Sequence, residues 1–258
     1  MILRRIREHV TSHNWFAVTI DLVIVVAGVF LGMQVNNWNE NRIEAQQGRD
    51  YRALLIGELD FNARQYRQQV AYYRQVKAHG LAMLGALRQP GRPRGADFLV
   101  DAYQATQIDP TPPKRYIYNE MMSAGLVSRL GDFRIQELAS DYYLNVTSVD
   151  EVAAEAPPYR DIVRRAMPYP IQQQIQDRCG DRLVAFKGRV VGIALLDKCE
   201  LDLSPALLGE GVSRVSGQPN LELDLNRYLG ALDLKLALLD FNRRLSEELG
   251  AELQKVHG

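Results

Sequence analysis

The sequence predicts a mainly α-helical protein. An N-terminal transmembrane helix continues into a long helix, and an antiparallel helical domain follows, with a small β-hairpin near a disulfide. Three observations favour this fold: an apolar run near the N-terminus, two long segments with apolar residues three or four positions apart, and two cysteines around a segment rich in β-branched residues. The 258 residues, 47% of them hydrophobic, suffice for one or two domains with a sizeable core. The 31 basic and 31 acidic residues cancel, which removes the electrostatic argument for binding nucleic acid.

Residues 15–35 form the predicted span and carry one charge, that of Asp21. As a helix these 21 residues would be about 31 Å long, matching a hydrocarbon core of about 30 Å. Trp15 and Trp38 bracket the run at the level expected for lipid headgroups. A buried helix of a soluble protein is the alternative, but such helices seldom stay apolar on every face for this length. The run is also too long for a cleaved signal peptide, so we expect an uncleaved anchor that crosses the bilayer once.

The flanks of the span predict its orientation. Residues 1–14 form a basic tail, and basic residues favour the cytoplasmic side of a membrane. The domain of residues 36–258 would then lie outside the cytoplasm. The charges concerned are Arg4, Arg5 and Arg7 before the span, and Arg42 and Arg49 beside Glu40 and Glu44 after it.

The chain has two cysteines, Cys179 and Cys199, which are 20 positions apart. No other cysteine and no nearby histidine could complete a zinc site. A disulfide in an oxidising compartment is therefore favoured, and it would stabilise the fold by about 3 kcal/mol. Two unrelated buried thiols remain the alternative.

A long helix is predicted after the span, from about residue 41 to residue 89. Its apolar stripe recurs at intervals of three, four or seven positions, and Pro90 ends it. The stripe consists of Leu55, Leu59, Tyr66, Val70, Tyr73, Gly80, Leu84 and Leu87.

Shorter helices follow, and Asp132 is expected to cap one of them. The stretch LVAF, Lys187-Gly188, RVVGIALL predicts the hairpin. Residues 209–217 are expected to form a glycine-rich connection, after which Pro219 opens the last helix.

The last helix has the leucine spacing of a helix-packing seam. A homotypic coiled coil is one interpretation. Polar or small residues at the next seam positions instead favour packing within the chain, antiparallel to the long helix. The seam is Leu225, Leu229, Leu232, Leu236 and Leu239, followed by Arg243, Ser246 and Gly250.

Two motifs resemble a bacterial family of single-span membrane proteins of unknown function. The first is an acidic residue in an apolar helix that runs into Asn36-Asn37-Trp38-Asn39-Glu40. The second is Tyr118-Asn119-Glu120-Met121-Met122-Ser123-Ala124-Gly125, followed by Leu130, Asp132 and Asp141-Tyr142-Tyr143. This chain departs from the family by carrying Asp21 where Glu is usual and by adding the two cysteines. The resemblance implies a helical periplasmic domain on an inner-membrane anchor, and it implies no activity.

Asp21 is the most unusual residue, since a carboxylate at the middle of a span costs about 2.5–3.5 kcal/mol. Gly28 and Gly32 lie within about 20° of it around the helix and form a small-xxx-small motif. This stripe predicts packing against another transmembrane helix, most simply in a homo-oligomer. The alternative is that Asp21 reaches the cytoplasmic interface and the glycines are incidental.

Glu120, Ser123 and Gly125 are expected to have a structural role, in capping and close packing at a helix end. The pairs Tyr72-Tyr73 and Tyr142-Tyr143 are expected to place at most one ring each in the core.

No cofactor or metal is expected, because the sequence lacks nucleotide-binding and catalytic motifs. His9 and His13 are four positions apart, but two ligands alone make a poor metal site.

These observations favour a self-associating, non-enzymatic membrane protein that binds or scaffolds an unidentified protein partner. One alternative is a subunit of an ion-driven or transport assembly in which Asp21 takes up and releases protons. The other is a periplasmic hydrolase that uses Glu120 with a second titratable group.

Overall fold

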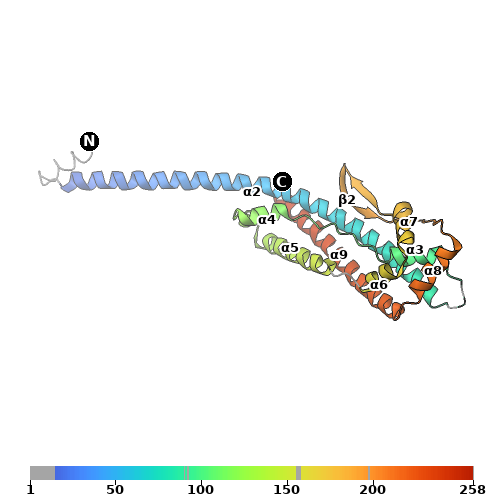
Figure 1. Ribbon diagram of the computed structural model, residues 1–258. Coiled ribbons are helices and arrows are strands. Elements are labelled where there is room, and N and C mark those ends of the chain that lie inside the picture. Colours follow the sequence, from blue (N-terminus) through green and yellow to red (C-terminus); the bar gives the residue numbers. More distant parts are fainter. Residues whose placement is uncertain (1–14, 90, 92, 155–157, 197, 258) are drawn as a thin grey trace. The chain divides into compact units, whose positions relative to one another are not determined.

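The computed structural model describes residues 15–89, 91, 93–154, 158–196 and 198–257 (Figure 1). The predicted basic tail of residues 1–14, with His9 and His13, lies outside the described residues. The chain forms two compact units, Met1–Tyr51 and Arg52–Gly258, which we describe separately.

A long apolar N-terminal helix is confirmed. Helix α2, Trp15–Leu87, runs for 73 residues without a break. Its residues up to Tyr51 belong to the first unit, and its residues from Arg52 onward form part of the helical second unit.

The predicted antiparallel packing of the two long helices is also confirmed. Helix α9, Leu221–His257, contacts α2 in the opposite chain order. Arg88 Nε donates to Glu222 Oε1 at 2.7 Å near the start of α9, whereas Ser246 Oγ donates to the carbonyl of Leu59 at 2.7 Å near its end. Ser246 is 1% exposed, so the seam continues past the leucines with a hydroxyl that bonds the facing backbone.

Shorter helices complete the second unit around this pair (Figure 1). Helices α5 and α6 pack on α9, and α3 packs with α6, α7 and α8. Asp132 Oδ1 accepts the N–H of Ile135 at 3.0 Å, as expected of the cap of α5. The elements are α3 (Ala96–Gln104), α4 (Tyr116–Ser123), the 3-10 helix η1 (Val127–Arg129), α5 (Phe133–Ala154), α6 (Pro158–Ala166), α7 (Tyr169–Cys179) and α8 (Pro205–Ser216).

Two sequence expectations are wrong. Both rings of each tyrosine pair are buried: Tyr72, Tyr73, Tyr142 and Tyr143 are at most 6% exposed. Other parts of the chain lie on more than one side of each tyrosine pair, so both adjacent rings contact protein instead of water.

The glycine-rich stretch 209–217 lies mostly in a helix, α8, rather than in a connection. Ser204 caps α8 by accepting the N–H of Leu207, and Pro205 occupies its first turn. Gly211 permits close packing, because a Cβ atom there would lie 2.4 Å from Ile171 Cδ1.

The predicted hairpin is present next to the disulfide. Strands β1 (Arg182–Phe186) and β2 (Arg189–Ala194) pair antiparallel around the turn Lys187-Gly188, where both residues have positive φ. Cys179, at the end of α7, is bonded to Cys199, and their Cα atoms are 5.4 Å apart. The disulfide therefore joins the two ends of the hairpin segment.

Gly80 provides the first test of the fold. A Cβ atom at Gly80 would lie 2.9 Å from Leu229 Cδ2 and 3.7 Å from Leu225 Cδ1, so this glycine sets the approach of α2 to α9. We expect Gly80→Leu to lower the free energy of unfolding by about 1–3 kcal/mol through overpacking. Thermal unfolding of the full chain in detergent, followed by circular dichroism, measures the effect.

Gly57 supplies the control on the same helix, because no atom lies within 4 Å of its ideal Cβ. Gly57→Leu should leave the unfolding midpoint unchanged or raise it through helix propensity. Equal unfolding midpoints for the two variants would show that Gly80 does not limit how closely α2 and α9 pack.

Candidate functional site

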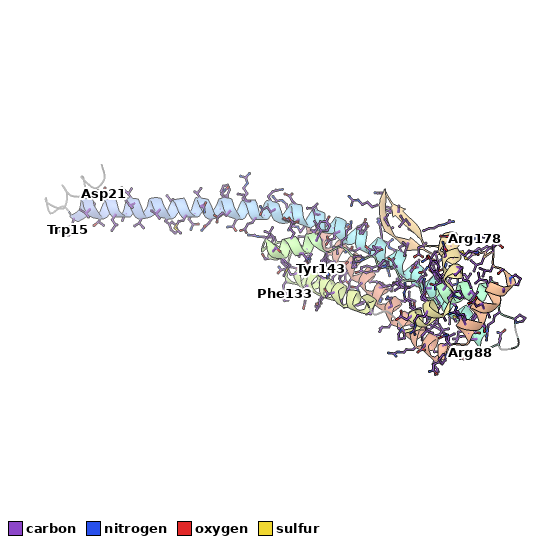
Figure 2. The ribbon with its side chains drawn as sticks, in the orientation of Figure 1. Trp15, Asp21, Arg88, Phe133, Tyr143 and Arg178 are labelled. Carbon is purple, nitrogen blue, oxygen red and sulfur yellow. A yellow bond between two sulfur atoms is a disulfide. The ribbon has the colours of Figure 1, made fainter. Side chains whose placement is uncertain are left out.

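The predicted span lies in the first unit, within α2. Of the described helices, α2 alone is long and apolar enough to cross a membrane, and its apolar window is 0% buried. Trp15 is 70% exposed and Trp38 is 65% exposed. Side chains project from both edges of this part of the helix, where Trp15 and Asp21 are labelled (Figure 2). An all-round apolar surface of this length is typical of a helix whose surroundings are lipid.

The three residues of the predicted packing stripe share one side of this helix. Asp21 is half-buried. No atom lies within 4 Å of an ideal Cβ at Gly28 or at Gly32, so the backbone there is open to a facing helix.

The second sequence motif forms a helix end. Gly125 has φ +70°, its N–H donates to the carbonyl of Met122 at 3.2 Å, and the N–H of Leu126 donates to the carbonyl of Met121 at 2.9 Å. These two bonds are those of a Schellman motif, which satisfies the last carbonyls of α4. Ser123 Oγ donates to the carbonyl of Asn119 at 2.9 Å within the same helix, and Glu120 is exposed. The structure thus places these residues at a turn.

Sequence reasoning missed a buried polar stripe on α2, formed by Glu58, Asn62, Gln65 and Gln69. These residues lie within about 60° of one another around the helix. Each is at most 6% exposed. Their spacing of four, three and four positions was the available signal, because it places all four side chains on one face of the helix.

The polar stripe holds the segment DPTPPK, residues 109–114, along α2. Asn62 Nδ2 donates to the carbonyl of Lys114 at 2.7 Å, and Asn62 Oδ1 accepts the N–H of Lys114 at 2.8 Å. Gln65 Nε2 donates to the carbonyls of Thr111 and Pro112 at 2.8 and 2.9 Å. Proline has no N–H but keeps its carbonyl, so a proline-rich segment requires donors from elsewhere. The stripe supplies them.

Three tyrosines pack beside this stripe, and their surroundings explain their pKa values. The Tyr143 hydroxyl donates to Glu58 Oε1 at 2.7 Å, and its ring stacks on that of Tyr118 with centroids 4.0 Å apart. Burial raises the pKa of Tyr142 to about 12, while the hydrogen bond from Asn62 acts in the opposite direction. Burial together with the Glu58 charge raises the pKa of Tyr143 further. The neutral hydroxyls of Tyr142 and Tyr143 therefore bridge α5 to α2, through Asn62 and Glu58.

A second buried polar group lies where the proline-rich segment begins. The Tyr73 hydroxyl donates to the carbonyl of Asp109 and accepts the N–H of Asp109 at 3.1 Å. Lys235 Nζ lies 3.4 Å from the same hydroxyl, and burial lowers the Lys235 pKa while Asp109 opposes this shift. Tyr73 of α2 and Lys235 of α9 therefore connect the start of the proline-rich segment to both long helices.

An open depression of about 350 Å³ is lined by Asp161, Arg164 and Arg165 of α6. Arg164 is committed within the fold, because it lies 3.5 Å over the Tyr103 ring and donates to Thr106 Oγ1 at 2.7 Å. Within the described ranges, no cluster of three or more metal-ligating side chains occurs.

Comparisons with protein-family models, with curated proteins and with solved structures find no match to this chain. The family resemblance of the two sequence motifs therefore stays a prediction.

The polar stripe generates the second test. Asn62→Ala would leave the Lys114 N–H and carbonyl without their side-chain partner, and we expect the free energy of unfolding to fall by about 2–4 kcal/mol. Urea unfolding of the full chain in detergent, followed by tyrosine fluorescence, measures this loss. Asn226→Ala, at an exposed position of α9, is the control and should change stability by less than about 0.5 kcal/mol. A loss no larger than that of the control would mean that the proline-rich segment does not depend on Asn62.

Proposed function

We propose that this chain is a single-span, non-enzymatic interaction protein, anchored by residues 15–35 in a bacterial inner membrane. The observation that carries the proposal is the apolar window of α2, of which 0% is buried. In water such a surface would be unfavourable by about 25 cal/mol for each Å² exposed, whereas lipid removes this cost.

The proposed orientation has the N-terminus in the cytoplasm and residues 36–258 in the periplasm. The three arginines before the span support it through the positive-inside rule. The Cys179–Cys199 bond supports it independently, because disulfides persist in the periplasm and are rare in the cytoplasm.

The interaction role is supported by how the buried polar groups are used. Glu58, Asn62 and Gln65 bond the chain's own backbone or tyrosines, and Glu120 lies exposed at a helix end. Such groups hold segments together rather than line a substrate cleft. The same proposal includes membership of the bacterial family of unknown function that the two sequence motifs resemble.

We further propose that the anchor self-associates through the stripe of Asp21, Gly28 and Gly32. The open backbone at both glycines allows two helices to approach closely, and the carboxyl group can then hydrogen-bond across the contact.

The anchor and its orientation are tested together. A phosphatase fused after Gly258 should be active in cells, because the enzyme requires the periplasm. Ile24→Arg with Val25→Arg should release the chain from the membrane fraction, since each arginine costs about 2.5–3.5 kcal/mol at mid-span. Leu54→Arg, at a 55% exposed position of the second unit, should leave the chain in the membrane. An inactive fusion would refute the orientation, and a wild-type chain in the soluble fraction would refute the anchor.

Self-association requires a separate measurement. Gly28→Ile with Gly32→Ile should reduce the signal of a membrane-insertion dimerisation reporter by about ten-fold, because the added side chains hold the backbones apart. Val23→Ile with Val26→Ile changes the opposite side of the helix and should leave the signal unchanged. Equal effects of both pairs would exclude the glycine side as the contact.

A further inference from the structure

The β-hairpin has one open edge. Phe186 pairs with Arg189 across the two-residue turn, so alternate residues of β1 direct their backbone groups away from β2. These residues are Leu183 and Ala185. Within the described ranges, no hydrogen bond joins them to an element other than β2.

The other edge of the hairpin is fastened to α2. Gln68 Nε2 donates to the carbonyl of Ile193 at 3.0 Å. Gln75 Oε1 accepts the N–H of Leu195 at 3.3 Å, just after β2. A further strand can therefore be added only beside β1.

One face of the hairpin is apolar and exposed. Leu183 and Ala185 share this face with their cross-strand partners Ile193 and Val190, because the register shift between Val184 and Ala185 adds one residue to β2 between these partners. Leu183 is 73% exposed and Val190 is 46% exposed. The opposite face is turned toward α2, since the Arg64 guanidinium lies 4.0 Å over the ring of Phe186. A strand pair with an apolar outward face lacks the covering layer that sheets normally have.

The hairpin is also basic. Residues 182–194 include three cationic side chains, Arg182, Lys187 and Arg189, and no acidic one. All three are exposed, and among the described residues none forms a salt bridge. Unpaired charges of one sign around an apolar centre favour a partner of the opposite sign.

The charge decides between the occupants of this face. A second copy of the chain would bring like charges together across a symmetric contact. A membrane surface would require an apolar tip, but Lys187-Gly188 forms the tip. Phe186 beside it packs against the Arg64 guanidinium, and Leu183, at 73% exposure, lies farther from the tip. An extended acidic segment of another protein can hydrogen-bond to the open edge, cover the apolar face and pair with the positive charges.

We propose that strand β1 binds an acidic, extended segment of a partner protein as a third strand of the hairpin sheet. Backbone hydrogen bonds at Leu183 and Ala185 provide the pairing, and alternate apolar side chains of the segment cover the exposed face. The segment's carboxylates pair with Arg182, Lys187 and Arg189. The proposal rests on the interaction role above and specifies the surface and the chemistry of the partner.

The test uses the full chain in detergent and fluorescent peptides of about ten residues with strand-forming apolar residues at alternate positions. The acidic peptide has glutamates between the apolar residues, and the basic peptide has lysines. A third peptide is acidic but N-methylated at alternate residues, which blocks strand pairing. Fluorescence anisotropy should show binding of the acidic peptide and at least about ten-fold weaker binding of the other two.

Variants locate the binding surface. Arg182→Glu with Arg189→Glu should weaken binding of the acidic peptide by about ten-fold or more and improve binding of the basic one. Arg74→Glu with Arg227→Glu makes the same charge change at exposed positions of α2 and α9 and should have no effect. Leu183→Glu should also weaken binding, whereas Leu234→Glu, at a 57% exposed position of α9, should not.

Three results would overturn the proposal: no binding of the acidic peptide, equal binding of acidic and basic peptides, or binding that N-methylation does not reduce. Co-flotation with phosphatidylglycerol vesicles that requires Arg182 and Arg189, without peptide binding, would replace the protein partner with a lipid surface. The binding assay in detergent does not depend on insertion or orientation. The phosphatase fusion tests the anchor separately, so the two proposals can fail independently.

Discussion

The second unit depends on a constraint set by proline. The segment of residues 109–114 has three prolines, which lack N–H groups and leave carbonyls that require donors. Buried side chains of α2 supply those donors, and Asn62 meets both the N–H and the carbonyl of Lys114. A buried amide is favourable only when its bonds are made, so segment and stripe require each other. The chain path between α3 and α4 follows from this requirement.

The two long helices provide the frame for these contacts. Gly80 permits α9 to approach α2, and Ser246 extends the contact beyond the leucine seam with a bond to the Leu59 carbonyl. Tyr73 and Lys235 then connect both helices to Asp109. Polar and apolar contacts therefore alternate along one interface, which fixes the register of the helices as well as their proximity.

The predicted span and the hairpin each expose an apolar surface, and the two surfaces differ in kind. The surface of residues 15–35 is exposed and mostly apolar, with Asp21 as its one charge, and such a surface suits lipid. The surface of the hairpin is apolar on one face, borders an open strand edge and is surrounded by arginine and lysine. Because the hairpin has one open edge and a positive charge, it suits a single partner bound in one orientation. The buried polar residues hold the fold together, whereas these two surfaces are the ones for which we propose partners.

The sequence alone determined the features that depend on local chemistry: the long apolar helix, the leucine seam, the Asp132 cap and the hairpin turn at Lys187-Gly188. Each reflects spacing or backbone preference that neighbouring residues already define. Tertiary structure decided that both members of each tyrosine pair are buried, that residues 209–217 are mostly helical, and that the α2 amides bond the proline-rich segment. The amide spacing was visible in the sequence. Its partners were not, because they lie some forty to fifty positions further along the chain and meet the amides only when the helices pack.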